Sequence, residues 1–342
     1  MAPITVGDVR FTGPALAACL YFPKQLEHLL SPRSKAWITS PLVVRTLAAI
    51  IGLDLLRKTS NMLSQRVSNN GKCVKFVPSK ELVLITGGCS GIGLLMAKEF
   101  AKRGAKVVIV DLNPPQETLP ENIHFYQSDV TSVDAVGATA SLIRKEHGDP
   151  TVLVNNAGVG TLQSILDGDE KSVRNTFDVN TISHFWTTRE FVPAMVKKNH
   201  GHIVTIASMA SYVVHALNVD YCCSKASALS FHEGLSSELR NIYNAPNVRT
   251  TVVNPSWIRT PLIERLINSK QWRTPVMEPE YVVNIIVDQV MAGKGGQIVL
   301  PPKLNYGTTI RGWPLWMQTG LRNWIGTELK KVRDSLEVIS SS

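Results

Sequence analysis

The sequence predicts an α/β fold with a doubly wound parallel sheet. Apolar runs of strand length recur at residues 82–85, 106–110, 152–154 and 203–206, and small or polar side chains follow each of them. The first run leads through a Gly-rich turn into an amphipathic stretch at 94–103, so a helix follows this strand. Buried strands that alternate with helices are typical of a parallel sheet covered on both faces.

The turn at residues 86–93 reads Thr-Gly-Gly-Cys-Ser-Gly-Ile-Gly and has the setting of a phosphate-binding turn. Glycines let the backbone approach a pyrophosphate, and the free N–H groups at the start of the following helix point toward it. A Gly-rich loop without a ligand is the weaker interpretation, because a strand and a helix flank the turn. The residues of this turn that we expect to contact a cofactor are Gly87, Ser90, Gly91, Ile92 and Gly93.

A carboxylate, Asp111, ends the second predicted strand. Its distance from the Gly turn is close to that expected for an acid that binds the adenosine ribose hydroxyls and repels a 2′-phosphate. The turn itself carries Cys89 and Ser90 where a phosphate-binding Arg or Lys would favour NADP. The sequence therefore favours NAD(H), with NADP(H) as the alternative. Residues 112–122 contain three prolines, so we expect no helix there and a more open adenine side.

Tyr221 and Lys225 are one helical turn apart, so they can meet on one face of a helix. A nearby ammonium favours the phenolate, and we expect the pKa of the tyrosine to fall toward the range where it exchanges protons with an alcohol or a carbonyl. Alone, this spacing also fits an ordinary surface pair. Two other segments support the catalytic interpretation. Small residues at 155–158 leave room for a flat cofactor, and the strand at 203–206 leads to the hydroxyl of Ser208.

Taken in this order, the segments resemble the short-chain dehydrogenase/reductase family, without a gap from about residue 81 to 300. The resemblance implies a Rossmann-type domain and NAD(P)-dependent interconversion of an alcohol and its ketone or aldehyde. It implies that Tyr221 is the general acid/base and that Ser208 holds the reacting oxygen. Lys225 would lower the tyrosine pKa and bind the nicotinamide ribose, and Asn180 would hold a proton-relay water. A catalytically silent, cofactor-binding scaffold is the competing hypothesis, but a scaffold has no physical need for these four residues together.

The resemblance also implies cofactor contacts outside the Gly turn. The family usually has Pro-Gly at the nicotinamide-side loop, where this chain has Pro255 and Ser256. The implied contacts are Asp111, Asp129, Val130, Asn156, Ala157, Gly158, Tyr221, Lys225, Ile258 and Thr260.

A finer resemblance lies in the segments at 184–188, 193–195, 199–205 and 231–232. They are similar to the membrane-associated branch that holds retinol dehydrogenases and lipid-droplet 17β-hydroxysteroid dehydrogenases. This similarity implies a protein on the endoplasmic reticulum or on lipid droplets, with its catalytic domain facing the cytosol.

The positive charge of the chain is concentrated in its first 80 residues. The 342 residues have a formal net charge of +9, and residues 1–80, with 11 Lys or Arg and 3 Asp or Glu, account for +8 of it. A basic extension favours attraction to anionic lipid headgroups, and nothing resembles a nucleic-acid-binding module. We therefore expect a membrane-associating extension at 1–80, a dehydrogenase domain at 81–303 and an amphipathic Trp-rich tail at 304–342.

Two apolar runs lie in the extension, at residues 11–22 and 41–56. The first is too short to span a bilayer, which takes about 20 apolar residues. Arg45 at the centre of a membrane helix would cost about 2.5–3.5 kcal/mol, so a shallow hairpin or interfacial helix fits the second run better than a clean span. The alternative is that the extension is an arm that packs on the domain or on a second subunit. A homodimer is therefore possible.

The tail carries three of the seven tryptophans of the chain, at helical spacing with other apolar residues and with basic residues nearby. Such a helix fits a membrane interface. It fits equally well a helix that closes the substrate pocket or forms a dimer contact. The apolar members are Trp313, Trp316, Met317, Leu321, Trp324 and Ile325.

The side chains that we expect to line the pocket limit the class of substrate. They are mostly apolar and include no Arg or Lys cluster for a carboxylate or phosphate. A lipophilic alcohol, ketone or aldehyde fits best, and a substrate of a secondary-metabolite pathway is the alternative. The expected lining residues are Val159, Met209, Tyr212, Val213, Val214, Trp257, Leu262, Ile263 and Leu266.

Neither the cysteines nor the histidines indicate a metal or disulfide framework. The five cysteines are an odd number, and two of them, Cys222 and Cys223, are adjacent, so reduced thiols are expected. His200 and His202 flank a glycine without a third ligand nearby, and we therefore expect no metal site.

Overall fold

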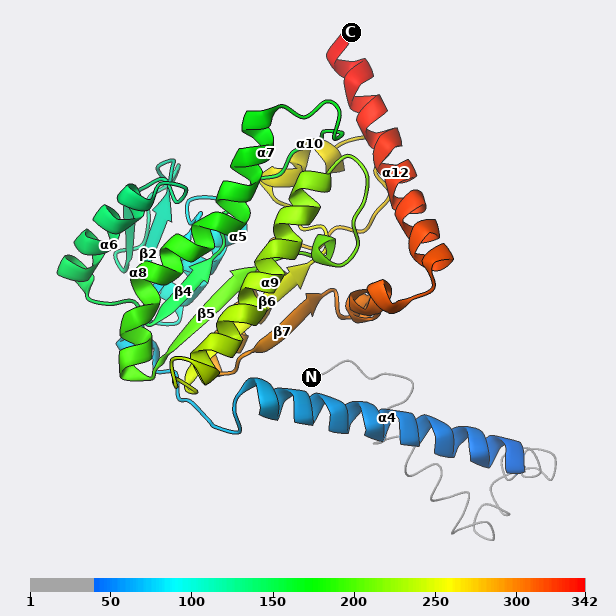
Figure 1. The fold of residues 1–342 in the computed structure, drawn as a ribbon, viewed down its shortest axis with the longest axis horizontal. Helices are drawn as coiled ribbons and strands as arrows, with labels where there is room; N and C mark the ends of the chain where they lie inside the picture. The colour runs from blue at the N-terminus through cyan, green and yellow to red at the C-terminus, as the bar shows by residue number, and fades with distance from the viewer. Residues whose placement is uncertain (1–39, 342) are drawn as a thin grey trace. The chain divides into compact units, whose positions relative to one another are not determined.

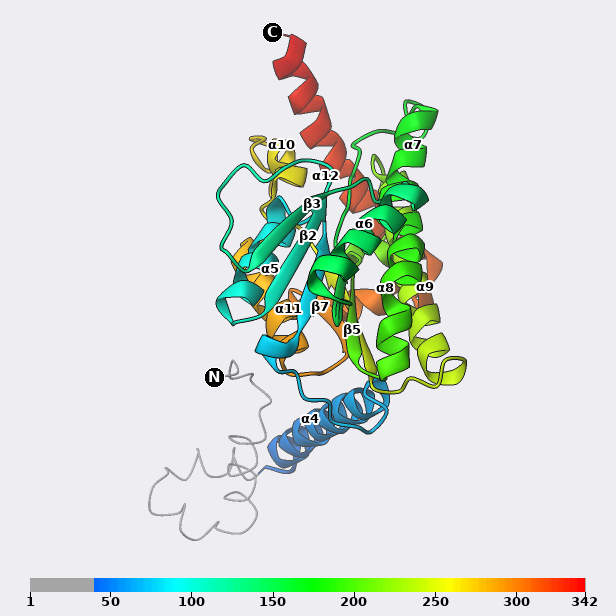
Figure 2. The same cartoon turned by 90° about the vertical axis from the view of Figure 1, so that its left-hand side faces the viewer.

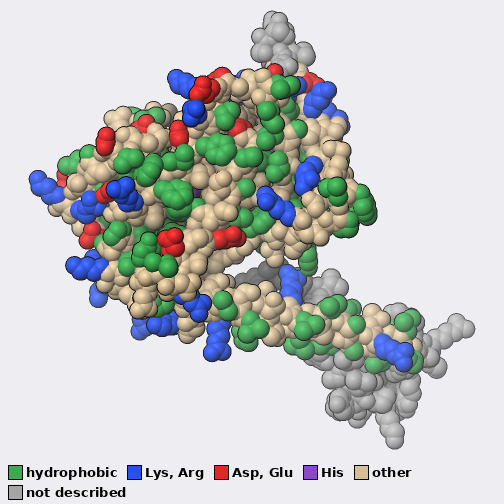
Figure 3. Space-filling model, viewed as in Figure 1, with side chains coloured by type: hydrophobic (Ala, Val, Ile, Leu, Met, Phe, Trp, Pro, Cys, Tyr) green, Lys and Arg blue, Asp and Glu red, His purple; other side chains and the backbone are tan. Residues whose placement is uncertain are grey.

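The computed structural model describes residues 40–341, and the chain divides into two compact units between Val67 and Ser68. The described part of the first unit is helix α4, Pro41–Ser68, which contains the predicted apolar run at 41–56 and continues beyond it. None of its residues is buried, and several large apolar side chains are exposed along it (Figure 3). Across the described residues, no helix is long and apolar enough to cross a membrane. The predicted run at 11–22 lies outside the described residues.

The second unit is built on one parallel sheet of seven strands in the order β3-β2-β1-β4-β5-β6-β7, which confirms the predicted fold (Figure 1). The strand order reverses between β1 and β4. In such sheets ligands bind outside the carboxyl ends of the strands at this switch point. The strands are β1 Leu82–Thr86, β2 Lys106–Asp111, β3 Ile123–Gln127, β4 Val152–Asn155, β5 Gly201–Ile206, β6 Val248–Pro255 and β7 Gly296–Leu300.

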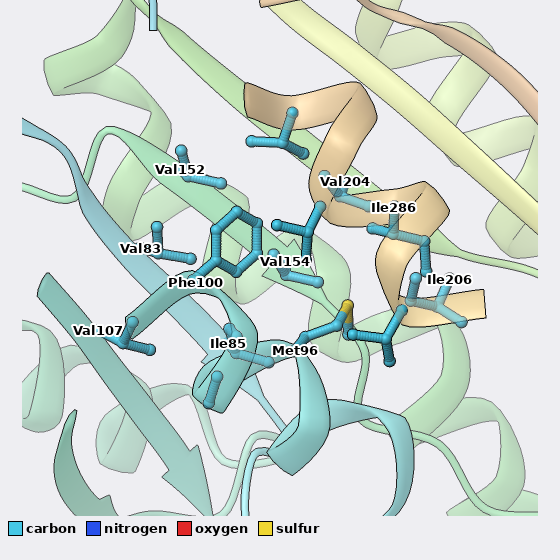
Figure 4. Packing of buried hydrophobic residues seen from close by; sticks show 14 of the residues in the cluster. Val83, Ile85, Met96, Phe100, Val107, Val152, Val154, Val204, Ile206 and Ile286 are labelled. Carbon is cyan, nitrogen blue, oxygen red and sulfur yellow. The ribbon is translucent and has the colours of Figure 1, made fainter. Parts of the chain in front are cut away.

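Helices cover both faces of the sheet (Figure 2). On one face, α5 (Gly91–Lys102) and α11 (Pro279–Met291) pack over a core that includes Met96, Phe100 and Ile286 (Figure 4). These three side chains are fully buried, and each contributes roughly 1.5–3 kcal/mol relative to exposure. On the other face lie α6 (Val133–His147), α8 (Ser183–Lys198) and α9 (Val219–Asn241).

The remaining helical segments lie in the connections. No helix forms at residues 112–122 between β2 and β3, as the three prolines there predict. The other segments are α7 Glu170–Phe177, a π-helical turn Asp178–Ile182, α10 Glu264–Ile267, α12 Leu315–Ser341, and 3₁₀ turns at Pro78–Lys80, Met209–Ser211, Pro261–Ile263 and Pro302–Gly312.

Helix α12 packs through one face only. Leu329 and Val332 are buried, and Ser335 Oγ lies 2.7 Å from Ser269 Oγ, just after α10. On the exposed side, Trp316 and Trp324 are 75% and 63% exposed, and hydrophobic side chains reach the surface at the start of the helix (Figure 3). The described part of the helix is therefore amphipathic.

A buried arginine fixes the segment that precedes β1. The guanidinium of Arg249 on β6 is 1% exposed and donates to the carbonyl oxygens of Asn69 at 2.7 Å and Lys72 at 2.6 Å. Burial lowers the pKa of this guanidinium. Its donors need acceptors when water is excluded. The residues from Asn69 onward thus belong to the folded unit.

Candidate active site

The Gly turn between β1 and α5 is too tightly packed for larger residues. Gly87 has a φ of 63°, in the left-handed region, and a Cβ there would lie 2.8 Å from the Cα of Ala157. A Cβ on Gly93 would overlap the carbonyl oxygen of Gly87. The turn can therefore fold back onto α5, with the exposed Ser90 at the N-cap position and the first helical N–H groups available for a phosphate.

Asn156 ties the end of β4 to this turn. Its Nδ2 donates to the carbonyl oxygens of Thr86 and Gly87, both at 2.9 Å. Its own N–H donates to Thr86 Oγ1 at 3.1 Å. The strand ends that flank the switch point are thus held together, and Asn156, Ala157 and Gly158 lie beside the turn as the sequence predicted.

Asp111 lies at the carboxyl end of β2, beside the Gly turn. Its Oδ2 accepts from the N–H of Cys89 at 3.0 Å and its Oδ1 from the N–H of Asn113 at 3.1 Å. Burial and the nearby carboxylate raise the pKa of the Cys89 thiol to about 12, so the thiol is neutral. A fixed carboxylate at this place can accept hydrogen bonds from ribose hydroxyls.

Asp129 and Val130, which we predict to lie on the adenine side, follow β3. Asp129 Oδ1 accepts from the N–H and the hydroxyl of Thr131, at 2.9 and 2.7 Å, and Val130 is buried against the sheet. Leu112, just after Asp111, is 58% exposed. The loop that replaces the usual helix leaves apolar surface uncovered on this side.

Tyr221 and Lys225 occupy the first turns of α9 and meet on one face of it. Lys225 Nζ lies 5.7 Å from the centroid of the Tyr221 ring and donates to the carbonyl oxygen of Ile206 at 2.8 Å. A Cβ on Gly158 would lie 3.4 Å from Lys225 Nζ and 3.4 Å from Asn180 Oδ1. The end of β4, the π-helical turn and α9 therefore converge on one point.

The predicted lowering of the Tyr221 pKa by Lys225 is wrong for this site as it stands. Burial raises the pKa of Tyr221 to about 12, and the hydrogen bond with Ser208 offsets only part of that effect. Burial also lowers the pKa of Lys225 to about 8, because the ammonium is removed from water. Desolvation dominates both groups, whereas the sequence argument considered only their mutual attraction.

Ser208 follows β5 and lies within reach of the tyrosine. Its hydroxyl donates to the carbonyl oxygen of Pro255 at 3.3 Å, accepts from the N–H of Ala210 at 3.1 Å, and hydrogen-bonds Tyr221. A hydroxyl beside the phenol can hold a reacting oxygen next to its proton donor.

Asn180 is fully buried in the π-helical turn. Its Oδ1 accepts from the N–H of Val159 at 2.8 Å, and its Nδ2 donates to the carbonyl oxygen of Val159 at 2.8 Å and to Ser224 Oγ at 2.9 Å. The amide thus joins the β4 loop to α9. π-helical turns of this kind are frequent at functional sites.

The loop after β6 closes the other side of the turn. A Cβ on Gly91 would lie 3.8 Å from Thr260, and Ile258 is buried and bridges to Met277. Ser256, which stands where the family usually has glycine, donates its N–H to the carbonyl oxygen of Leu300 at 2.7 Å. Its φ is not positive, so no glycine is required at this position.

Residues 81–271, more than half of the 342, match a family described as short chain dehydrogenase. The chain belongs to this family. Dehydrogenase RED2 of Cochliobolus heterostrophus is 45% identical over 177 residues, covering 51% of this chain and 67% of that protein. Human estradiol 17-beta-dehydrogenase 11 is 36% identical over 249 residues, covering 69% and 81%. Mouse epidermal retinol dehydrogenase 2 is 34% identical over 258 residues, covering 72% and 82%.

A solved structure supports the fold alone. Ligand-free aldohexose dehydrogenase of Thermoplasma acidophilum aligns with a TM-score of 0.57 at 24% identity, covering 64% of this chain and 92% of that one.

Sequence reasoning missed two polar residues that hold the segments of the proposed site together. Asp220, next to Tyr221, accepts from the hydroxyls of Thr161 at 2.7 Å and Thr176 at 3.0 Å, which ties the β4 loop and α7 to α9. Ser224 supplies the acceptor for Asn180. Both lie inside or next to the Tyr-x-x-x-Lys run, but only their tertiary partners reveal these roles.

Leu262 lies near Tyr221, and an aromatic group forms around Trp257 in the loop after β6. A Cβ on Gly160 would lie 3.4 Å from the Tyr221 ring and 3.8 Å from Leu262, so Leu262 is close to the phenol. Leu262 is half exposed. Trp257 lies edge to face with Trp272, with 5.0 Å between ring centroids, and 6.0 Å from the ring of His215. The sequence did not single out His215 or Trp272.

Tyr212 packs beside the sheet. Its ring lies in a small cluster with Ala207, Leu229 and Val252, and its hydroxyl accepts from Gln297 Nε2 at 3.0 Å. The ring is only partly buried there, and its place in the substrate pocket stays a prediction.

Within residues 40–341, no group of three or more His, Cys, Asp or Glu side chains is arranged to hold a metal ion. His200 Nε2 lies 3.1 Å from Glu81 Oε2, and His202 Nε2 lies 2.8 Å from Thr251 Oγ1. The cysteines at 73, 89, 222 and 223 are free; Cys19 lies outside the described residues.

Proposed function

We propose that this short-chain dehydrogenase interconverts a lipophilic alcohol and its ketone or aldehyde, with Tyr221 as general acid/base. The proposal is carried by one observation: Asn180, Ser208, Tyr221 and Lys225 converge at the carboxyl ends of β4 and β5, beside the Gly turn. The residues of the turn fit a nicotinamide dinucleotide, since only glycine is accommodated at Gly87 and Gly93. That cofactor supplies or accepts the hydride.

The chain's own residues handle the proton and the orientation of the substrate. Ser208 holds the substrate oxygen, and in the reductive direction Tyr221 gives its proton to that oxygen; oxidation is the reverse. A phenol whose pKa is raised by burial is fully protonated at neutral pH, which suits the donor role. Lys225 and the ribose-side residues orient the cofactor, and Asn180 holds the loop that carries Gly158.

The substrate class rests on the apolar surroundings of Tyr221 and on the relatives. Leu262, Trp257 and Trp272 offer apolar contacts and no paired charge. Relatives that are named for estradiol and retinol favour a steroid- or retinoid-like molecule. The name Dehydrogenase RED2 states no substrate, so the secondary-metabolite alternative stands beside it. Reduction and oxidation of cofactor across a panel of lipophilic alcohols and ketones tests the proposal. No turnover with any of them, together with intact cofactor binding, would favour the silent scaffold.

Asp111 should set cofactor preference. Like charges at short range repel, so a carboxylate that is fixed beside the turn disfavours the 2′-phosphate of NADP. Asp111→Ser should raise the NADP-to-NAD ratio of kcat/KM by about tenfold or more. Glu117→Ser is the matched control, since Glu117 lies in the same loop and pairs with Lys98 at 2.7 Å on the surface. A wild-type enzyme that already prefers NADP would contradict the assignment.

The first unit should hold the protein on a membrane of the endoplasmic reticulum or a lipid droplet. The first unit, residues 1–67, holds 8 Lys or Arg and 3 Asp or Glu, a net charge of +5. It attracts anionic headgroups by about 1 kcal/mol per basic residue near the surface, and the exposed apolar side chains of α4 can insert. In flotation with vesicles that contain phosphatidylserine, the full chain should float and residues 68–342 should stay at the bottom while still binding cofactor.

The site of the cut matters in this comparison. A cut after residue 75 would remove the carbonyl groups of Asn69 and Lys72 and leave the buried Arg249 guanidinium without them, so that protein should be less stable. A full chain that stays at the bottom would make the first unit a packing or dimer arm. If the full chain instead stays bound to the vesicles in high salt and alkaline carbonate, the first unit inserts more deeply than an interfacial helix.

A further inference from the structure

Helix α12 lies beyond the residues that match the short-chain dehydrogenase family, and the chemistry proposed above does not use it. One face of the helix is nevertheless packed on the folded domain. Leu329 and Val332 on that face are buried, and the helix lies beside α10 in both views of the fold (Figure 1 and Figure 2). The helix contacts three loops at the carboxyl ends of the strands: 156–169 after β4, 207–218 after β5 and 256–278 after β6.

The contact with the loop after β5 depends on a glycine. A Cβ on Gly326 would lie 3.2 Å from the Cβ of Ala216, so a longer side chain at this position would push the helix and the loop apart. Leu217, the next residue of the loop, is buried with a φ of 65°, a backbone conformation that leucine rarely adopts. Such a conformation persists only where the surrounding packing holds it. Helix α12 is thus placed to hold this loop in shape.

The contact with the loop after β6 is a hydrogen bond between two serines. The hydroxyl of Ser335 donates to the carbonyl oxygen of Val332 at 2.6 Å. Ser269 is therefore the donor in the 2.7 Å contact between the Ser269 and Ser335 hydroxyls. Because Ser269 is only 7% exposed, this hydrogen bond joins α12 to a part of the loop that is shielded from water.

The contact with the loop after β4 is an ion pair at the surface. A guanidinium nitrogen of Arg333 lies 3.9 Å from a carboxylate oxygen of Asp167, and an exposed pair of this kind contributes little by itself. The same loop carries Ile165 and Leu166, which are 72% and 96% exposed. A segment with so little burial opens easily, so even a weak contact limits its motion.

The three loops also meet at the phenol of Tyr221. In the loop after β4, a Cβ on Gly160 would lie 3.4 Å from the Tyr221 ring and 3.8 Å from Leu262 of the loop after β6. In the loop after β5, Ser208 hydrogen-bonds Tyr221. One helix therefore contacts all three of the loops that meet beside the proposed proton donor.

We propose that α12 fixes the shape of the substrate site from outside it, with Gly326 as the positioning residue, and thereby sets the selectivity for bulky lipophilic substrates. The loops carry apolar side chains that such a substrate would contact, among them Trp257 and Leu262. The Gly turn is held separately by Asn156. The effect on selectivity rests on the proposed function, whereas the restraint on the loops does not.

Gly326→Leu and Gly320→Leu form a matched pair on one helix. Leucine at 326 has no room beside Ala216 and should push α12 off the loop. In the part of the chain that the structure describes, a Cβ on Gly320 would meet nothing within 4 Å, so leucine there should leave the packing unchanged. Both variants replace Gly by Leu inside a helix, so they share the same gain in helix propensity.

Hydrogen–deuterium exchange of the cofactor-free protein measures the restraint directly. The N–H groups of Tyr212 and Val213 both donate to the carbonyl oxygen of Met209 in the loop after β5. Their exchange should become about tenfold faster in Gly326→Leu and should not change in Gly320→Leu. The amides of β1 and β2 should stay protected in both variants, which separates a local release of the loops from a loss of global stability.

Steady-state kinetics measure the effect on selectivity. In Gly326→Leu, KM for the best lipophilic substrate of the panel should rise about tenfold, with kcat and cofactor affinity within about threefold of the wild type. KM for isopropanol should not change, because so small an alcohol makes few contacts with the loops. Gly320→Leu should match the wild type with both substrates.

Leu329→Ala is the second variant, should Gly326→Leu fail to fold. It weakens the same face of α12 by removing a buried side chain without any overlap, and it should move both measurements in the same direction. If no compound of the panel is turned over, the proposed function fails, and faster loop exchange in Gly326→Leu still supports the restraint by α12. Exchange rates as slow as those of Gly320→Leu in both other variants would overturn the inference. Faster exchange with an unchanged KM for the lipophilic substrate would overturn the role in selectivity.

Discussion

Tyr221→Phe is expected to abolish turnover while leaving cofactor binding nearly intact. The substitution removes the phenolic oxygen and nothing else, and general acid/base groups contribute about 10²–10⁴-fold in rate. The phosphate turn is held by Gly87, Gly93 and Asn156, none of which contacts the lost oxygen. Steady-state kinetics with the best substrate and fluorescence titration of the reduced cofactor measure the two effects separately.

Lys225→Ala provides the comparison for this result. It should weaken cofactor binding as well as turnover, because its ammonium lies between the phenol and Gly158 at the expected ribose position. If the turnover rate of Tyr221→Phe fell by only a few-fold, Tyr221 would not be the general acid/base. Unchanged cofactor affinity in Lys225→Ala would mean that Lys225 does not bind the ribose.

The motifs of the sequence were sufficient to predict the sheet and to bring the residues of the proposed site to one edge of it. Asp111 and Asn155 end their strands and Ser208 follows β5 by two residues, so these side chains lie at one edge, where the carboxyl ends of parallel strands meet. The prolines at 112–122 correctly predicted a loop. Patterns of this kind are local in the sequence, and the sheet topology brings the residues that they mark close together.

What the sequence could not supply was burial. The pKa of Tyr221 depends on desolvation by the whole of α9 and its neighbours, which no local pattern reports. The packing of Tyr212 against Leu229 and Val252 depends in the same way on tertiary contacts. The partners of Asp220, and Asn69 and Lys72 as partners of Arg249, are 44 to 180 residues away along the chain, so these contacts were invisible before folding.

Acidification should destabilise the folded domain well before its carboxylates are protonated. His184, His202 and His232 are 1%, 2% and 7% exposed, and burial lowers their pKa values to about 3, 3 and 4. The unfolded chain binds these protons near pH 6.5, whereas the folded chain does not. The contribution of each histidine is therefore fully present above pH 6.5 and is lost as the pH falls toward the folded-state value.

The expected loss is large on the scale of protein stability. Each histidine costs about 1.4 kcal/mol per pH unit below 6.5, so at pH 5 the three together remove about 6 kcal/mol, against about 5–15 kcal/mol for a typical domain. Burial also lowers the pKa values of His124, His147 and His215, which act in the same direction. Carboxylates with ordinary pKa values near 4 remain mostly ionised at pH 5, so this window isolates the histidines.

Denaturant unfolding of residues 68–342 between pH 8 and pH 5 measures this loss, and His232→Phe isolates one histidine. Because His232 Nδ1 has no partner in the described part of the chain, its replacement breaks no hydrogen bond at that atom. The variant should retain its stability at pH 8 to within about 1–2 kcal/mol and lose about 2 kcal/mol less than the wild type on acidification to pH 5. A wild-type stability that is flat from pH 8 to pH 5 would mean that these histidines take up protons without a cost. In that case water would have to reach them in the folded state, and burial would not set their charge.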